Sequence, residues 1–263
     1  MTTATREAFE LVHEVHGTGD PVLLISGTND TKSDWGTVVP ALEGFQRITF
    51  DNRDVGESPR ATAPYSVADM AYDAKTLLDR LGIARAHVVG HSMGGTIAQE
   101  LALLAPERVR SLVLVGTFPR ADAYLAELID TWKRLRRQLP VEDFARAAIF
   151  SWCGATTIAT AGMKDLLEFV IPAVEAQEID AFERQLDATT ARDRRTLLPS
   201  IGAPTLVVWG NEDATVPHSL ARELADGIPG AQFRVIEGTG HGPHLEQPEA
   251  FNAMVLEFLR SVA

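Results

Sequence analysis

Apolar and polar positions follow two different periods along the chain. Short apolar runs of strand length recur at residues 22–25, 47–50, 87–89, 111–115, 204–209 and 232–236. Between them, apolar residues return every three or four positions, which predicts amphipathic helices over residues 34–42, 67–81 and 93–105, from about residue 218, and at the end of the chain. Strands and helices in alternation specify a mostly parallel sheet with helices on both faces, so the predicted fold class is α/β.

The segment before the first apolar run has its own pattern. Residues 9–15 roughly alternate between polar and apolar, and glycine, aspartate and proline form a turn signal at 17–21. Residues 22–25 are then continuously apolar. We interpret this pattern as a hairpin that leads into a buried strand.

One interval of the chain lacks strands. Between Phe118 and Pro199 the periodicity is helical. We therefore expect residues 119–199 to form a helical cap inserted into a core made of residues 1–118 and 200–263. Most aromatic residues of the interval are expected to hold the cap together and a few to line a substrate cavity: Tyr124, Trp132, Phe144, Phe150, Trp152, Phe169 and Phe182.

The strongest chemical signal lies where a strand meets a helix. The apolar run 87–89 leads into Gly-His-Ser-Met-Gly-Gly at positions 90–95, and a helical pattern follows. Gly-x-Ser-x-Gly in this context is typical of a nucleophile elbow, in which the serine occupies a sharp turn. Gly90 and Gly94 leave room for the backbone that passes close to this turn. Ser92 is therefore the candidate nucleophile, beside the free N–H groups that begin the following helix.

A serine hydroxyl needs a base to remove its proton and an acid to orient that base. Both should lie on loops at the carboxyl ends of parallel strands, where the elbow also points. Two loops meet this condition. Asp213 follows the apolar run 204–209, and His241 lies between two glycines after the run 232–236. The sequence therefore predicts a triad of Ser92, Asp213 and His241.

Other residues compete for these roles. His244 is the alternative base, although its neighbours favour a helix entry or a pocket wall. Glu212 and Asp122 are the alternative acids. His91 is expected to pack or to form a local hydrogen bond, with its side chain directed away from Ser92. The remaining histidines are expected to be structural or exposed: His13, His16, His87 and His218.

Two backbone N–H groups are predicted to form an oxyanion hole, which stabilises the negative oxygen of a tetrahedral intermediate. One belongs to Met93, directly after the nucleophile, and the other to Thr28, in the loop 26–30. An ordinary strand-end turn is the alternative interpretation of that loop.

Two charged clusters are expected to be structural. In the loop 51–58, Asp51 and Arg53 are expected to pair with each other and brace a strand end. The second cluster is expected to form a solvated helix face of the cap: Lys133, Arg134, Arg136 and Arg137.

Composition narrows the class of partners. The 263 residues suffice for one large domain, and a formal net charge of −12 without a long basic run argues against a nucleic-acid partner. A single cysteine, Cys153, excludes an internal disulfide and fits a reducing compartment. Residues 1–7 lack a signal-peptide pattern, and no apolar run has the length that spans a bilayer. We therefore expect a cytoplasmic protein with no membrane partner.

These motifs together resemble the α/β-hydrolase superfamily over nearly the whole chain outside the cap. The order nucleophile, acid, histidine is that of the family, and Glu-Gln-Pro-Glu follows at 246–249. Phe-Asp-Asn-Arg at 50–53 is similar to small bacterial serine esterases, enol-lactonases and cofactor-free bromoperoxidase-like proteins. Such proteins often have histidine in place of Ser26 and glycine in place of Asp54. The first difference concerns the oxyanion loop, and the second is expected to affect only local structure.

The resemblance implies an α/β-hydrolase fold and a serine hydrolase that cleaves a small ester or lactone of apolar character through an acyl-enzyme on Ser92. No metal or organic cofactor is required. A carbon-carbon bond hydrolase of a vinylogous diketone is an alternative, although such enzymes typically have asparagine in place of His91 and an aromatic residue in place of Gly242. A non-catalytic receptor for a small ligand is a third interpretation.

Overall fold

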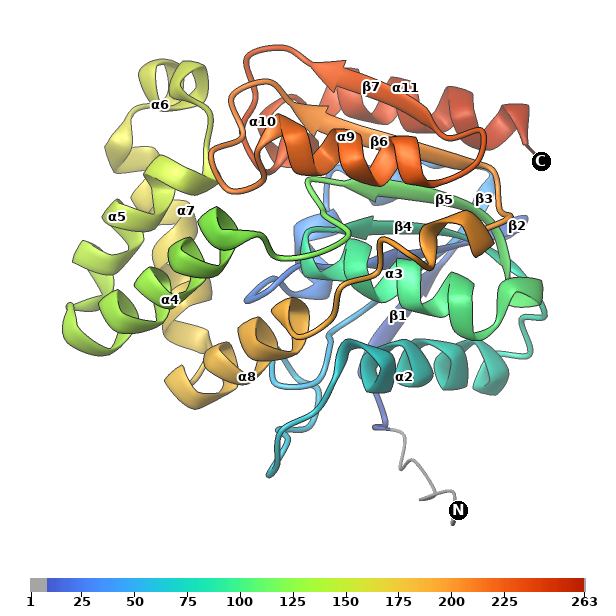
Figure 1. Ribbon diagram of the computed structural model, residues 1–263, viewed down its shortest axis with the longest axis horizontal. Helices are drawn as coiled ribbons and strands as arrows, with labels where there is room; N and C mark the ends of the chain where they lie inside the picture. Colours follow the sequence, from blue (N-terminus) through green and yellow to red (C-terminus); the bar gives the residue numbers. More distant parts are fainter. Residues whose placement is uncertain (1–8, 263) are drawn as a thin grey trace.

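The computed structural model describes residues 9–262, in which a seven-stranded sheet is covered by helices on both faces (Figure 1). The strands lie in the order β1-β3-β2-β4-β5-β6-β7. β1 is antiparallel to β3, and the other pairings of the described strands are parallel, which confirms the predicted fold class. Residues 1–7, in which the sequence lacks a signal-peptide pattern, lie outside the described residues. The bounds of the strands are β1 His13–His16, β2 Asp20–Ile25, β3 Phe45–Phe50, β4 Ala86–His91, β5 Val109–Val115, β6 Thr205–Gly210 and β7 Gln232–Ile236.

The hairpin predicted over residues 9–25 is wrong. β1 pairs with β3, with His13 opposite Phe50, and not with the strand that follows it in sequence. β2 lies near the middle of the sheet, between β3 and β4. Its last four residues are fully buried, whereas β1 is mostly exposed. A continuously apolar strand is stable with neighbours on both edges, so the half-polar β1 takes the edge of the sheet.

Alternate residues of the central strands face different helices. On one face, α2 (Val67–Arg80) and α3 (Met93–Leu104) pack against side chains that include Leu23 and Val88. On the other face, α1 (Val38–Ala41) and α11 (Pro248–Ser261) pack against Leu24 and Val89. The other helical segments of the core are α9 His218–Gly227, α10 Pro243–Glu246 and three 3-10 turns, η1 Lys32–Trp35, η2 Pro106–Arg108 and η3 Leu198–Ser200.

The helix predicted over residues 34–42 is divided in the structure. Thr31 caps η1 through its side chain, and η1 ends at Trp35 with Gly36 as its C-cap. α1 then begins at Val38 and extends for a single turn. The apolar periodicity therefore identified the buried positions, including Trp35, but not the break between the two turns.

Helices α4 to α8 form the cap and lie between β5 and β6 in the chain. Residues 118–199, all of them described, contain no strand, as the periodicity predicts. In Figure 1 most of the cap lies beyond the ends of β6 and β7, at the left of the view. The division of the chain at residues 118/119 and 199/200 stays a prediction. The cap helices are α4 Ala123–Gln138, α5 Val141–Trp152, α6 Ala155–Ala161, α7 Met163–Ala176 and α8 Ile179–Thr190.

The cap has an apolar interior that continues into the core. Trp132, Phe144 and Phe182 are buried there, in one cluster with Val216 of the core. Phe150 on α5 points outward instead, with 63% of its surface exposed. These contacts attach the cap to the loop after β6, which also carries a predicted site residue.

The basic cluster of the cap differs from the expected solvated face at one position. Lys133, Arg134 and Arg137 pair with acidic residues at the surface. Arg136 is buried, and its guanidinium donates to the carbonyl oxygen of Val174 at 2.9 Å. It occupies the face of α4 that packs on other cap helices, so the expectation is wrong for this residue.

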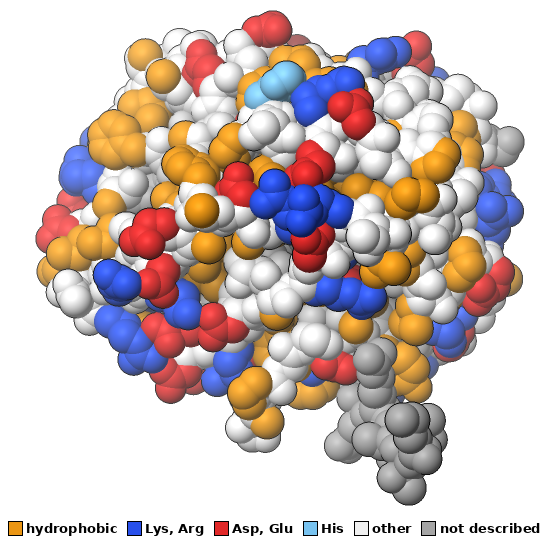
Figure 2. All heavy atoms as spheres, viewed as in Figure 1, with side chains coloured by type: hydrophobic (Ala, Val, Ile, Leu, Met, Phe, Trp, Pro, Cys, Tyr) orange, Lys and Arg blue, Asp and Glu red, His pale blue; other side chains and the backbone are white. Residues whose placement is uncertain are grey.

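Basic and acidic side chains are intermixed on the face of the molecule seen in Figure 2. Among the described residues, several basic and acidic side chains pair directly, such as Arg120 with Glu223 at 3.0 Å and Arg195 with Asp193 at 2.6 Å. No helix among the described residues is long and apolar enough to cross a membrane.

Candidate active site

Ser92 lies at the turn between β4 and α3. Its backbone has φ 52° and ψ −117°, in the left-handed half of the map that side chains rarely adopt. A methyl group on Gly94 would collide with the carbonyl oxygen of Ile25, and one on Gly90 would collide with Gly94. The glycines therefore permit the close approach that holds Ser92 in a strained conformation, a feature that is common at functional sites.

The structure brings the three residues of the predicted triad together. His241 Nε2 lies 2.9 Å from Ser92 Oγ, and His241 Nδ1 lies 3.0 Å from Asp213 Oδ2. The other carboxylate oxygen of Asp213 accepts hydrogen bonds from the backbone N–H groups of Thr215 and Val216, each at 2.8 Å. An ionised carboxylate only accepts, so Nδ1 of His241 carries the proton and Nε2 is free to accept one from Ser92.

The charge around His241 suits a base. Burial acts to lower the pKa of His241, but the Asp213 carboxylate, with the charges of Asp30 and Glu246 behind it, outweighs burial and raises the pKa above its ordinary value. A basic imidazole beside a serine hydroxyl can take its proton during attack on a carbonyl and return it to a leaving group.

Similarity to known proteins agrees with this geometry. The family model of the alpha/beta hydrolase fold matches residues 20–158 and 176–248, which is most of the chain. The chain belongs to the α/β-hydrolase family. Two curated members are similar over most of their length. RutD of Azorhizobium caulinodans, named as a carbamate hydrolase, is 35% identical over 95% of this chain and 94% of its own. BpoC of Mycobacterium tuberculosis, named as a non-heme bromoperoxidase, is 35% identical over 96% and 98%.

Solved structures of other α/β-hydrolases superimpose closely on this one. The crystal structure of BpoC has a TM-score of 0.89 at 33% identity and covers 100% of both chains. An esterase from Thermogutta terrifontis has a TM-score of 0.88 at 31% identity, over 99% of this chain and 97% of its own. The enol-lactonase of Burkholderia xenovorans has a TM-score of 0.87 at 26% identity, over 96% and 97%. The chain is therefore similar to hydrolases of several substrate classes.

The alternative acids of this α/β-hydrolase have other partners. Glu212 accepts hydrogen bonds from the backbone N–H and the hydroxyl of Thr156, at 2.7 and 2.6 Å. Asp122 caps α4 by accepting from the N–H of Leu125 at 2.9 Å. Of the three candidates, Asp213 is the one that the structure places on the His241 ring.

Two further histidines lie near His241, and the ring of His91 is tilted by 55° against that of His241 at 5.0 Å between centroids. His91 Nε2 lies 3.0 Å from the carbonyl oxygen of His241, so the hydrogen bond of His91 joins two distant parts of the chain and is not the local one expected. The ring of His244 lies 4.6 Å from that of His91 and 4.9 Å from that of Trp35. Burial, reinforced by the two neighbouring histidines, holds the pKa of His244 well below its ordinary value. His244 is therefore neutral, and it lies buried between His91, Trp35 and Phe251.

The remaining histidines have structural contacts. His87 bonds to Ser111 Oγ at 2.8 Å, and burial lowers its pKa to about 4. His218 stacks on Trp209 at 4.9 Å between ring centroids. His13 and His16 bond within the β1 region, to Leu11 and Glu14.

The loop predicted to supply an oxyanion donor passes directly beside the elbow. A methyl group on Gly27 would lie 3.2 Å from Ser92 Cβ, and the hydroxyl of Thr28 lies 3.6 Å from the sulfur of Met93. The structure thus brings Thr28 and Met93 together beside Ser92. Their N–H groups as oxyanion donors stay a prediction.

A cap residue holds this loop in place. The amide of Gln185 on α8 is fully buried. Its oxygen accepts from the N–H of Asn29 at 3.1 Å and from the amide of Gln177 at 2.9 Å, and its nitrogen donates to the carbonyl of Arg53 at 2.9 Å. Sequence reasoning missed Gln185, because a glutamine within a helical pattern has no signature that separates it from a surface residue.

The predicted pairing of Asp51 with Arg53 is wrong. Asp51 accepts from the ammonium group of Lys32 at 3.1 Å. Arg53 pairs with Asp73 of α2 at 2.6 Å, and the ring of Phe9 lies 4.1 Å below its guanidinium. Each side chain thus reaches a different neighbouring element, Asp51 the start of η1 and Arg53 the helix α2. The loop is nonetheless structural.

Asp54 occupies a position at which similar proteins often have glycine. Its φ of 73° lies in the left-handed region, which is the conformation that favours the glycine often found there. Its carboxylate is fully buried and accepts from Arg184 of α8 at 2.8 and 2.9 Å. The effect of this aspartate is thus not only local, because it joins the core to the cap.

The described part of the chain offers neither a metal-binding cluster nor a reactive thiol. Among the described residues, no group of three or more histidine, cysteine, aspartate or glutamate side chains could hold a metal ion. Burial, with the charge of Glu246, raises the pKa of the Cys153 thiol to about 12, so this cysteine is not a nucleophile at neutral pH.

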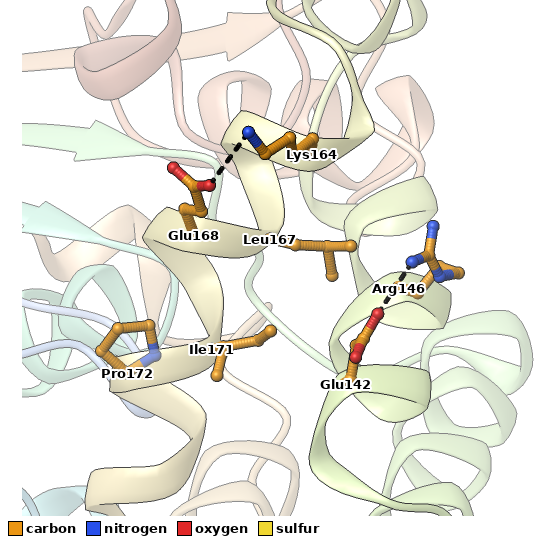
Figure 3. Close-up of a pocket in the computed structure, with 7 residues that line it drawn as sticks. All are labelled: Glu142, Arg146, Lys164, Leu167, Glu168, Ile171 and Pro172. Atoms are coloured by element: carbon orange, nitrogen blue, oxygen red, sulfur yellow. Dashed lines mark hydrogen bonds and ion pairs between the residues drawn. The ribbon is translucent and has the colours of Figure 1, made fainter.

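A groove in the cap is lined by helices that carry none of the predicted triad residues. It encloses about 520 Å³ between α5 and α7, with Leu167 and Ile171 on its wall. Figure 3 shows two ion pairs along its rims, Glu142 with Arg146 and Lys164 with Glu168. None of its side chains belongs to the triad or its loops.

Proposed function

We propose that this protein is a serine hydrolase that cleaves a carboxylic ester or lactone through an acyl-enzyme on Ser92. The observation that carries the proposal is the continuous hydrogen-bonded chain from Ser92 Oγ through His241 to Asp213. Similarity to proteins named as an esterase and an enol-lactonase supports the choice of bond.

The proposed reaction has two halves. Ser92 Oγ attacks the substrate carbonyl while His241 Nε2 takes its proton, and the N–H groups of Met93 and Thr28 stabilise the oxyanion. The tetrahedral intermediate collapses, the bond to the alkoxy oxygen breaks, and His241 gives its proton to the leaving alcohol. His241 then takes a proton from water as the water attacks the acyl-enzyme. When the second tetrahedral intermediate collapses, the bond to Ser92 Oγ breaks, His241 returns the proton to Ser92 Oγ, and the acid is released. Asp213 remains ionised and stabilises the imidazolium in both halves.

The surroundings of the triad favour an apolar substrate. The acid loop adjoins the apolar cluster of the cap through Val216, and Phe118 belongs to the same cluster directly after β5. Three basic residues on the elements around the oxyanion loop are already paired with carboxylates, namely Lys32, Arg53 and Arg184. An anionic substrate group would therefore compete with existing ion pairs.

The first test is reaction with a fluorophosphonate, which phosphonylates activated serines. We expect one label per chain, located at Ser92 by peptide mass spectrometry and lost in His241→Ala. A well-folded protein without label at Ser92 would contradict the proposal. Turnover of p-nitrophenyl esters, lactones and aryl carbamates then identifies the bond, the carbamates being included because of the name that RutD carries.

The same measurements separate the alternatives. A carbon-carbon bond hydrolase would turn over a vinylogous diketone faster than any ester in the panel. A receptor would bind its ligand tightly and release it more quickly than it hydrolyses it. Multiple fast turnovers of an ester or lactone would exclude the receptor.

A further inference from the structure

One carboxylate binds the backbone on both sides of His241. Glu246 accepts hydrogen bonds from the N–H of Gly240 at 2.9 and 3.0 Å and from the N–H of Gly242 at 3.2 Å. The two glycines are the chain neighbours of His241. Glycine loses more conformational freedom than other residues when it is fixed, so a histidine between two glycines needs an external constraint to keep one orientation.

The same carboxylate also binds the cap. It accepts from the N–H of Gly154 at 2.8 Å and from the hydroxyl of Thr157 at 2.6 Å. A methyl group on Gly154 would lie 2.8 Å from the nitrogen of Gly240, so cap and histidine loop are in direct contact there. Four donors from two distant parts of the chain therefore converge on one side chain.

Neighbouring contacts tie the same cap segment to both loops of the triad. The N–H of His241 donates to the carbonyl of Trp152 at 2.9 Å. The hydroxyl of Thr215, two residues after Asp213, donates to the carbonyl of Ser151 at 2.8 Å. The segment 151–157 is thus hydrogen-bonded to both loops that carry the predicted acid and base.

We propose that Glu246 is a positioning residue for His241, which fixes the backbone on both sides of the histidine and anchors it to Gly154 and Thr157 of the cap. The inference rests on the proposed function, in which His241 is the base. Its effect is on the orientation and the charge environment of the imidazole, and Glu246 itself does not touch the substrate.

The test compares Glu246→Gln with Glu249→Gln. Glutamine has the shape of glutamate, but an NH₂ group replaces one of the two accepting oxygens. This NH₂ group cannot accept hydrogen bonds from the surrounding N–H donors. Glu249 is exposed in the first turn of α11, so its substitution removes the same charge three residues away. We expect Glu246→Gln to slow fluorophosphonate labelling of Ser92 by about 10- to 100-fold, the effect of a misplaced catalytic group, and Glu249→Gln to leave it unchanged.

A second readout excludes a role in folding alone. The groups that face His241 are Asp213, Asp30 and Glu246, with the rings of His91 and His244 beside it. Loss of one anion disfavours the imidazolium, so the midpoint of the His241 titration, followed by NMR of its ring proton, should move to lower pH in Glu246→Gln. A folded Glu246→Gln protein with wild-type labelling rate and wild-type midpoint would overturn the proposal.

Thr157→Val separates the cap contact from the charge. It removes one hydrogen bond to Glu246 and keeps the carboxylate, so labelling should slow by about 3- to 10-fold while the His241 midpoint stays in place. If Glu246→Gln does not fold, this variant decides the question, and a wild-type labelling rate would refute the link to the cap. If the wild-type protein itself is not labelled, the proposed function fails, whereas the NMR midpoints still test Glu246.

Discussion

The core and the cap contribute to the candidate site by different physical means. The core supplies Ser92, Asp213 and His241 on turns at strand ends, and steric demands on glycines such as Gly94 fix these turns. The cap supplies polar groups, such as Gln185, that bond to the loops of the core. The core therefore sets where the reacting atoms lie, and the cap restrains how far the loops around them can move.

This difference predicts a ranking of substitutions. Changes in the core residues should remove activity or destabilise the fold, whereas changes in the cap contacts should weaken activity by smaller factors. Cap variants that lower activity as much as core variants do would contradict the distinction.

The largest effect is expected for Ser92→Ala. Loss of the nucleophile should lower kcat on the best ester by a factor on the order of 10⁵ to 10⁶, because the covalent route is closed. Circular dichroism and thermal unfolding should resemble those of the wild type, since the substitution removes one oxygen. Retained turnover would show that the hydroxyl of Ser92 does not react.

Asp213→Asn should have the next largest effect. An amide in place of the carboxylate favours the wrong tautomer of His241, and kcat should fall by a factor on the order of 10⁴. The wild-type rate should be lost as the pH falls through the raised pKa of His241, since protonated imidazole cannot accept the serine proton. Without the Asp213 charge that pKa falls, so in the variant the acidic limb of kcat/KM should move to lower pH. An unmoved limb would assign the acid role to another residue.

Gly94→Ala tests the steric basis of the elbow. The added methyl group would collide with the carbonyl of Ile25, and overpacking of this kind costs about 1–3 kcal/mol in the free energy of unfolding. Gly202→Ala is the matched control, because no atom lies within 4 Å of the added group and the position is exposed. Urea unfolding should separate the two variants. Equal stability would mean that the elbow relaxes more easily than the geometry indicates.

The same contrast explains what could be predicted from the sequence. The strands, α2, α3 and the proximity of the predicted triad residues left clear signals, because buried strands are continuously apolar and a tight turn at Ser92 requires glycine on both sides. The pairing of β1 and the partners of Arg53 left none, since they depend on which distant element offers a free edge or a carboxylate. Gln185 and Glu246 are of this second kind, although Glu246 does belong to the family-like segment 246–249. Contacts between elements that are remote in sequence become visible only in the fold.

The most direct test of the cap is Gln185→Leu, for which we expect a smaller loss of kcat than for Ser92→Ala or Asp213→Asn. Leucine fills a similar volume but leaves the buried N–H of Asn29 and the carbonyl of Arg53 without their partner, which costs about 1–3 kcal/mol in the free energy of unfolding. Because Asn29 follows Thr28, a proposed oxyanion donor, kcat should also fall, by about 10-fold, with little change in KM. Gln138→Leu, at the exposed end of α4, is the control for hydrophobicity and should leave both quantities unchanged. A stability loss without a change in kcat would mean that α8 braces the fold while the oxyanion loop keeps its position unaided.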